Sequence, residues 1–402
     1  MTMLKRGSFW HGVRVALVSV ALVALGCGGG TTVSAPQGAP TIAGFTATPA
    51  TIAAGQSSTL SWSVTAASTL TIDQGVGGVT GSTSKLVSPT ATTTYTLTAS
   101  NTAGSATATA TATVTASPGS SPSCVGLPAT CGGSKNCCAS NVVAGGAFNR
   151  SDDPSFPATV SAFKLDVYEV TVGRFRAFVN AGMGTQAKPP AAGDGAHPKI
   201  ASSGWDPASN ASLPADTAAL KAELKCNGAY PAWSDAPSGK ETNPINCVSW
   251  FEAFAFCAWD GGRLPTEAEW NYAAAGGGEQ RAYPWGASID ATKASYNCSG
   301  RGPGTCVFSD MRPVGSFSPL GDGKWGQADL AGNVWEYTLD YSAEPYRLTT
   351  CTDCADLQPA PYRTFRGGGF ANESFNEVTS TRLARSPGLA DYDVGVRCAR
   401  DR

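Results

Sequence analysis

Cysteines offer the widest choice of chemistry in this chain of 402 residues, which has thirteen of them. A thiolate can act as a nucleophile, as a redox group or as a ligand for a soft metal ion. Cys351 and Cys354 form a C-x-x-C motif, which can be a redox pair or a local disulfide. The only histidines are His11 and His197, which argues against a histidine-rich zinc or non-haem iron site. Since Pro198 follows it, we expect His197 in an exposed loop rather than as a general base.

The number of cysteines also indicates the compartment. Many cysteines without zinc-finger spacing are typical of an oxidising environment, where they pair as disulfides. Four of them lie too close together to build a core, so we expect a disulfide knot for which three pairings are possible. Two further local bridges are predicted. The knot residues are Cys124, Cys131, Cys137 and Cys138, and the two bridges are Cys226–Cys247 and Cys298–Cys306.

Residues 1–26 have the pattern of a secretory signal peptide. A basic start precedes an apolar run from Val13 to Leu25, which is too short for an ordinary membrane span. Gly26 followed by Cys27 resembles a bacterial lipoprotein cleavage site, where Cys27 becomes the lipidated N-terminus. We therefore expect a protein anchored to a membrane of the bacterial cell envelope, facing the periplasm or the exterior. Ordinary signal peptidase could also cleave after Gly26, which would give a secreted protein.

The segments that follow differ in composition. Residues 27–39 are predicted to be a tether, and residues 40–116 are rich in Thr, Ser, Ala and Val with almost no charge. Strict alternation places Leu60 and Trp62 on one strand face and Tyr95 and Leu97 on another. Such strands between Gly and Pro turns predict an all-β, immunoglobulin-like sandwich. The predicted sandwich could bind a ligand, but we favour the interpretation that it is a spacer.

Residues 117–141 are predicted to be a linker followed by the cysteine-rich knot, and residues 142–402 a second domain. Charged residues make up only 14% of the chain, and the net charge is −2. No basic stripe is present, so nucleic acid is not expected as a partner. The segment from Met183 to Asn243 is rich in Pro and Gly and is read as a surface excursion.

Two short helices can be predicted from their capping residues. Ser249 with Glu252 is a capping box that starts one helix, and Thr266 with Glu269 starts another. In the first helix, Trp250, Ala253, Phe254 and Cys257 form an apolar stripe, and the glycines at 261 and 262 end it. Helices this short need irregular structure from the rest of the chain to pack against.

These helices carry motifs that resemble the formylglycine-generating enzyme (sulfatase-modifying factor) family. The string V-S-W…F-C-A-W…R-L-P-T-E-A-E-W…Y-P-W-G is similar to the family's, and three later motifs agree with it in order. They are L-A-G-N-V-W-E-Y from Leu330, F-R-G-G-G-F from Phe365 and G-V-R-C-A-R from Gly395. The resemblance implies an α+β, C-type-lectin-like domain over residues 142–402 with little regular secondary structure.

The resemblance also implies structural pairings and metal sites. Cys257 and Cys398 correspond to a disulfide that joins the first helix to the last strand. The family's calcium sites consist largely of backbone carbonyls, which suit this hard cation. One would use the Glu336 carboxylate with three carbonyls, and a second would start at Asn297. The three carbonyls belong to Ala331, Gly332 and Val334.

The catalytic positions depart from the family's pattern. Family enzymes oxidise a substrate cysteine to formylglycine with O₂, using Cu(I) held by two cysteines after a G-G-S-[WF] turn. Here Asn372 and Glu377 stand at the two cysteine positions, and Gly369 replaces the serine. Soft Cu(I) needs thiolates, so we expect no Cu(I) site of the family's kind.

Three functions remain open. We favour an exported, membrane-anchored binding protein that holds a peptide, protein or glycan at the cell envelope. A second hypothesis is other enzyme chemistry, with Glu373 or Glu377 as acid–base groups beside Arg382 or Arg385. The third is true formylglycine generation on exported sulfatases.

Overall fold

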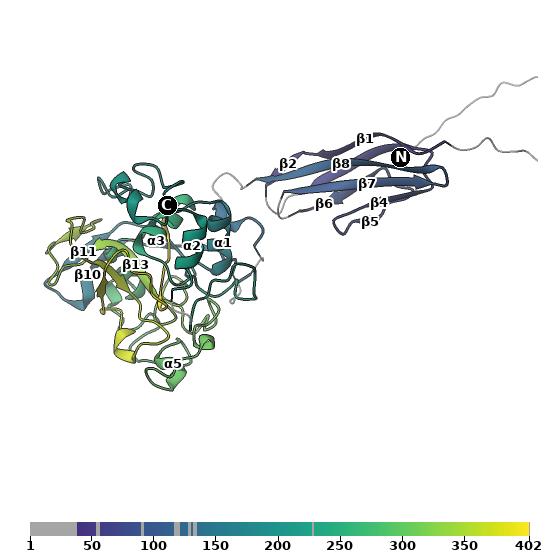
Figure 1. The fold of residues 1–402 in the computed structure, drawn as a ribbon. Helices are drawn as coiled ribbons and strands as arrows, with labels where there is room; N and C mark the ends of the chain where they lie inside the picture. Colours follow the sequence, from purple (N-terminus) through teal and green to yellow (C-terminus); the bar gives the residue numbers. More distant parts are fainter. Residues whose placement is uncertain are drawn as a thin grey trace, which may run out of the picture.

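Two sheets are built from strands between Thr41 and Thr115 (Figure 1). The computed structural model describes residues 38–53, 57–89, 92–115, 121–127, 130–131, 135–226 and 229–401. One sheet has the order β1 (Thr41–Thr48), β3 (Ser58–Thr65), β6 (Ser84–Val87). The other has the order β2 (Thr51–Ala53), β8 (Gly104–Thr115), β7 (Thr93–Asn101), β4 (Thr69–Ile72), β5 (Gly77–Gly78). Strand β2 pairs in parallel with β8, and the other ladders are antiparallel.

The core between these sheets follows from alternation in the sequence. Leu60, Trp62, Tyr95 and Leu97 are buried and pack in one cluster, while Ser61 and Thr96, which alternate with them, are only half-buried. The indole of Trp62 donates to the carbonyl of Ser82, which satisfies its one polar group. This cluster contains no residue from beyond position 112, so the sandwich has a core of its own.

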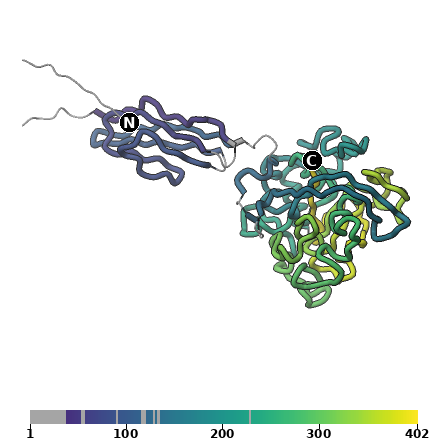
Figure 2. Tube along the Cα trace, turned by 180° about the vertical axis from the view of Figure 1, so that it is seen from behind, coloured from purple at the N-terminus to yellow at the C-terminus, as the bar shows by residue number. Residues whose placement is uncertain are grey.

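The rest of the described chain mixes short strands, short helices and long irregular segments. Its three sheets have the orders β10 (Gly146–Asn149), β11 (Pro157–Val160), β14 (Cys351–Thr352); β18 (Ala399–Arg400), β12 (Phe163–Asp166), β9 (Ser140–Val143); and β16 (Leu383–Arg385), β15 (Arg363–Arg366), β13 (Trp335–Tyr341), β17 (Val394–Gly395). The α-helices are α1 (Val172–Asn180), α2 (Thr217–Glu223), α3 (Trp250–Trp259), α4 (Glu267–Ala274) and α5 (Asn297–Gly300). The 3₁₀ turns are η1 (Pro122–Cys124), η2 (Arg150–Asp152), η3 (Pro207–Ser212), η4 (Gly277–Glu279), η5 (Phe308–Asp310) and η6 (Ser374–Asn376). This mixture is an α+β arrangement. Figure 2 shows that the C-terminal strand returns to the start of this body, where β18 pairs with β12.

Both predicted capping boxes are present. The Ser249 hydroxyl accepts from the Glu252 amide while the Glu252 carboxylate accepts from the Ser249 amide, and α3 begins at the next residue. Thr266 and Glu269 do the same for α4. The buried side chains of α3 join the main core cluster and those of α4 join a second one. Local capping therefore determines where the two helices start, and the packing of their buried side chains in the cores stabilises them.

The segment from residue 183 to 243 differs from the surface excursion that was predicted. It contains α2 and η3, and it inserts large apolar side chains into the main core. Trp205 packs on Phe254 of α3 with ring centroids 5.4 Å apart, and its indole donates to Asn210. The segment was misread because its apolar residues are widely spaced among glycines and prolines. Its inserted residues include Trp205, Leu213, Leu220, Leu224, Ala232 and Trp233.

Six disulfides cross-link the described residues of this body. The predicted Cys257–Cys398 bridge is present and closes a separation of 141 residues. The two predicted local bridges are also present, and Cys351 is bonded to Cys354. Of the three possible knots, the structure has Cys124–Cys138 with Cys131–Cys137.

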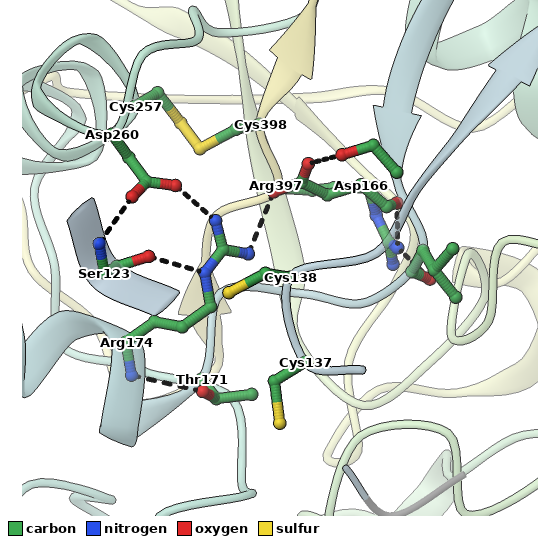
Figure 3. A network of polar contacts seen from close by, with 12 residues as sticks. Ser123, Cys137, Cys138, Asp166, Thr171, Arg174, Cys257, Asp260, Arg397 and Cys398 are labelled. Carbon is green, nitrogen blue, oxygen red and sulfur yellow. Dashed lines mark hydrogen bonds and ion pairs between the residues drawn. A yellow bond between two sulfur atoms is a disulfide. The ribbon is translucent and has the colours of Figure 1, made fainter. Parts of the chain in front are cut away.

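A buried ionic network lies beside the Cys257–Cys398 bridge (Figure 3). Arg174 of α1 is fully buried and binds Asp166 at 2.9 Å and Asp260 at 2.6 Å. Its Nε donates to the Ser123 hydroxyl, so the network ties η1 to α1 and to the end of α3. Burial alone would raise the pKa of Asp166, but Arg400 and Arg174 hold it below its ordinary value. A charge set this well paired can stay buried without a large penalty.

None of the helices in the described ranges combines the length and apolar character needed to span a bilayer.

Candidate functional site

A glycine turn after β15 gathers the residues at the family's copper positions. Gly367 and Gly368 have φ of +105° and +75°, a conformation that glycine adopts without strain. The Cα of Gly368 faces the Glu377 carboxyl group, which would overlap a Cβ atom there. A Cβ on Gly369 would lie 2.9 Å from Asn372 Oδ1. The structure thus brings Asn372 and Glu377 to the same turn, as the sequence motif implied.

Asn372 is held as a hydrogen-bond acceptor. The Trp335 indole donates to its Oδ1 at 2.7 Å, and the Asn297 amide donates to its backbone oxygen at 2.7 Å. An amide oxygen is a hard donor atom, and here it is already used. Position 372 therefore orients Trp335 and the Asn297 turn, and it offers nothing to a soft metal.

Glu377 is buried without a partner. The residue is 1% exposed, and no hydrogen bond of normal geometry reaches either carboxyl oxygen. Burial raises its pKa well above the ordinary value, outweighing the nearby backbone groups of Gly332 and Gly369 that lower it. A buried carboxyl group in this setting favours its protonated, uncharged form. It can donate or accept a hydrogen bond, but it is not a thiolate substitute.

No thiolate is available elsewhere in the described part of the chain. All twelve cysteines there are bonded in disulfides, including Cys351 and Cys354, which lie nearest to the turn in sequence. Cys27, the predicted lipidation site, lies outside the described residues. The donor set around the glycine turn therefore does not fit Cu(I), which requires soft ligands.

Glu336, predicted as a calcium ligand, is engaged otherwise. Arg397 donates to its carboxylate at 2.7 and 3.0 Å, and the Trp270 indole donates at 2.7 Å. Both side chains of the ion pair are completely buried. The carboxylate is thus neutralised and fully hydrogen-bonded, and it does not fit the role of a free calcium ligand.

The other calcium candidates are backbone positions around the same loop. Ala331, Gly332 and Val334 precede β13, and Glu169 orders this loop by accepting from the Asn333 side chain and from the Val334 amide. Asn297 has φ of +50°, and its buried Oδ1 has no hydrogen-bond partner among the described residues. Within the described ranges, no three His, Cys, Asp or Glu side chains come together as a metal site.

The acid–base groups suggested by the sequence do not come together. Arg382 pairs with Glu344 at 2.9 Å, and Arg385 pairs with Asp391. Glu373 is exposed, and neither arginine forms an ion pair with it or with Glu377. Both arginines pair with other carboxylates, so no ion pair among the described residues supports this catalytic hypothesis.

His197 is buried rather than exposed, contrary to the prediction. It is 5% exposed, its Nδ1 accepts from the Lys199 amide, and its Nε2 lies 3.4 Å from Glu269 Oε1. Arg263 and His197 lower the pKa of Glu269 to about 2, although burial would raise it. His197 therefore anchors its loop to the start of α4. Its ring accepts from the Lys199 amide and faces Glu269, and the Ser203 hydroxyl bonds to its backbone amide and carbonyl rather than to its ring.

The structure also contains a cavity that the sequence did not predict as a site. Arg363 of β15 lies between the rings of Trp250 and Tyr341, at the wall of a cavity. Alternation along β15 could have separated Arg363 and Phe365 from Thr364 and Arg366. The stacking partners, however, come from α3 and β13 and could not be read from local pattern.

Comparison with known proteins establishes the family. Residues 131–402 match the family described as "Sulfatase-modifying factor enzyme 1-like domain", and the chain belongs to this family. The "Formylglycine-generating enzyme" of Thermomonospora curvata is 30% identical over 296 residues, covering 64% of this chain and 92% of the relative. The "Inactive C-alpha-formylglycine-generating enzyme 2" of Mus musculus is 35% identical over 167 residues, covering 39% of this chain and 48% of that protein. The solved structure of PvdO from Pseudomonas aeruginosa aligns with 69% of this chain and 99% of its own length, at 20% identity and a TM-score of 0.46.

Proposed function

We propose that this protein is an exported member of the family that binds a peptide, protein or glycan at the cell envelope and does not oxidise cysteine through Cu(I). One observation carries the proposal. The two family copper positions hold an amide already bonded to Trp335 and a buried, unpartnered carboxyl group. With every described cysteine in a disulfide, the soft ligands that Cu(I) requires are missing from the site.

The relatives are compatible with this proposal. One of them carries the printed name of an inactive formylglycine-generating enzyme, so the family includes members named for the lack of that activity. The scaffold in this chain is intact, with the Cys257–Cys398 bridge and the buried Arg397–Glu336 pair in place. A conserved fold with an altered site is a common route to a binding function.

The proposal extends to the other parts of the chain. We take the sandwich of β1 to β8 as an immunoglobulin-like spacer and the second body as a C-type-lectin-like domain. The signal-peptide pattern of residues 1–26 and the Gly26–Cys27 junction support export and lipid anchoring. Calcium bound by backbone carbonyls near Gly332 belongs to the proposal, without Glu336 as a ligand.

Copper content and oxygen consumption test the central claim. The purified protein is titrated anaerobically with Cu(I) against a chromogenic chelator, and oxygen uptake is measured with a Cys-x-Pro-x-Arg peptide. We expect no stoichiometric copper and no uptake above the peptide-free rate. The double variant Asn372→Cys with Glu377→Cys should gain copper, whereas exposed Glu373→Cys with Asn376→Cys should not form the same site. Stoichiometric copper with peptide turnover by the unchanged protein would instead establish the alternative function, formylglycine generation or a related oxidation.

A further inference from the structure

A cavity of about 170 Å³ lies between the loop at residues 202–209, helix α3 and strands β13 and β15. Four of its thirteen lining residues are aromatic, and Arg363 is the one cation among them. The residues that matter to the argument are Trp205, Asp206, Trp250, Tyr341 and Arg363. None of its lining residues belongs to the glycine turn, so the cavity is distinct from the family's copper position.

Arg363 is a buried cation without a counter-ion. The residue is 8% exposed, and its guanidinium carbon lies 3.4 Å from the Tyr341 ring centroid and 3.7 Å from that of Trp250. Its Nη1 donates to the Leu339 carbonyl at 2.6 Å, and its Nε has no partner. No carboxylate in the described ranges forms an ion pair with it. Cation–π stacking thus holds the group while leaving donors unused.

Among the buried arginines of the described residues, Arg150 shares this state: it is 3% exposed, stacks on Tyr346 and forms no ion pair, but it does not line this cavity. Arg174, Arg366 and Arg397 are fully buried, and each is paired with at least one carboxylate. Burial lowers the pKa of Arg363 to about 10, against the opposing effects of Tyr341 and Asp340. A cation removed from water and left unpaired attracts an incoming anion more strongly than a surface arginine would.

We propose that this cavity binds the carboxylate of a ligand whose attached body is a ring or a similarly flat apolar group. The planar guanidinium fork matches a carboxylate, and the aromatic walls match a flat body of one residue or one sugar unit. A tetrahedral dianion fits less well, because Arg363 is the only cation lining the cavity and Asp206 lies there with it. The C-terminal residue of a peptide and a uronic acid share the required chemistry.

The loop at residues 202–209 forms part of the cavity wall and is held in place by contacts within the protein. Trp205 is fixed by Phe254 and by its hydrogen bond to Asn210, so one wall is rigid before any ligand arrives. The Ser203 hydroxyl bonds to the backbone of His197, and the His197 ring lies 3.4 Å from Glu269, so the loop is linked to α4. Because this wall is already ordered, binding a ligand against it costs little conformational entropy. The inference stands whether or not the copper proposal is correct, because it depends on different residues.

Calorimetric titration of the purified full-length protein tests the proposal. The probes are N-acetylphenylalanine against its amide, and glucuronate against glucose, so that each pair differs in the carboxylate. We expect at least one acid to bind and its neutral partner to bind about tenfold to hundredfold more weakly. Which acid binds identifies the source of the carboxylate. Binding of neither acid, or equal binding of acid and neutral partner, overturns the proposal.

Variants separate binding from folding. Arg363→Lys keeps the charge but loses the fork, and Arg363→Met removes the charge; we expect both to lose the preference for the acid. Arg176→Met is the matched control, because Arg176 also stacks on a tryptophan, Trp233, but is paired with Glu241 and does not line the cavity. It should bind like the parent protein. If Arg363→Met unfolds, Asp206→Asn remains decisive, because removing the negative charge should tighten binding of the acid and leave the neutral probe unchanged. Tight acid binding by a folded Arg363→Met variant would also overturn the proposal.

Discussion

At the scale of single residues, the departures from the family's catalytic motif fit one another. Asn372 is larger than a cysteine, and its Oδ1 occupies space that a side chain at 369 would need. Gly369 leaves that space free, and Trp335 completes the arrangement by donating to the amide. The three residues form one packed unit, so a change at one position should depend on the other two.

This dependence gives the first prediction. Gly369→Ser, which restores the family's serine, should destabilise the protein by about 1–3 kcal/mol because its Cβ meets Asn372 Oδ1. In an Asn372→Cys background the same change should cost clearly less. Urea denaturation of the four proteins in this double-mutant cycle measures the coupling. Equal costs in both backgrounds would mean that the two positions do not interact.

Glu377 gives the second prediction, which concerns pH. Burial raises its pKa in the folded protein well above the ordinary value of 4.5, so the folded state binds a proton more readily than the unfolded chain. Wild-type stability is therefore fully retained below about pH 4.5 and falls as the pH rises toward the folded pKa. The Glu377→Gln variant has no carboxyl group to ionise at this position, so it does not lose stability in this way as the pH rises. Its advantage over wild type should grow above that pH by up to about 1.4 kcal/mol per pH unit.

Denaturation curves at several pH values, from about 4 to 8, provide the measurement. The matched control is Glu373→Gln, whose side chain is exposed and should change stability little at any pH. A difference between wild type and Glu377→Gln that stays flat across the range would show that the carboxyl group is solvated in solution.

At the scale of elements, local rules predicted what depends on neighbouring residues. The capping boxes located the starts of α3 and α4 because cap and partner are three residues apart. The roles of Glu336 and His197 were missed because their partners, Arg397 and Glu269, are far away in sequence. For the same reason the aromatic stacking of Arg363 could not be foreseen. The family resemblance predicted a long-range contact where its motifs imply a bonded pair, as for Cys257 with Cys398.

That bridge gives a prediction for the elements it joins. Cys257 and Cys398 are fully buried in the main core, and the separation of 141 residues makes their link costly to lose. In the chain-entropy model, changing both to alanine should remove about 5 kcal/mol of stability. The Cys351–Cys354 pair, separated by 3 residues, should cost only about 2 kcal/mol when removed in the same way. Thermal and urea unfolding under oxidising conditions compare the two. Equal losses would contradict a dominant effect of loop length.

At the scale of the whole molecule, the chain consists of parts stabilised in different ways. The core of β1 to β8 depends on alternating apolar residues and has no disulfide among its described residues. The family domain has few long elements, and six bridges and several buried ion pairs hold its irregular segments together. Disulfides of this density require an oxidising compartment to form. The stability of the domain therefore depends on the redox state of the compartment in which it folds.

The last prediction concerns Cys27. The twelve cysteines of the described residues pair with one another in six disulfides, so none of them is left over to pair with Cys27. Its place after Gly26 and an apolar run suits lipidation of the new N-terminus. Cys27→Ser should abolish incorporation of a fatty-acid label and move the protein from the membrane to the soluble fraction of the envelope. Cys351→Ser, which leaves the leader intact, should stay with the membrane. If Cys27→Ser fractionates as before and the parent protein takes up no label, the chain is released by ordinary signal peptidase and reaches its ligands as a soluble protein.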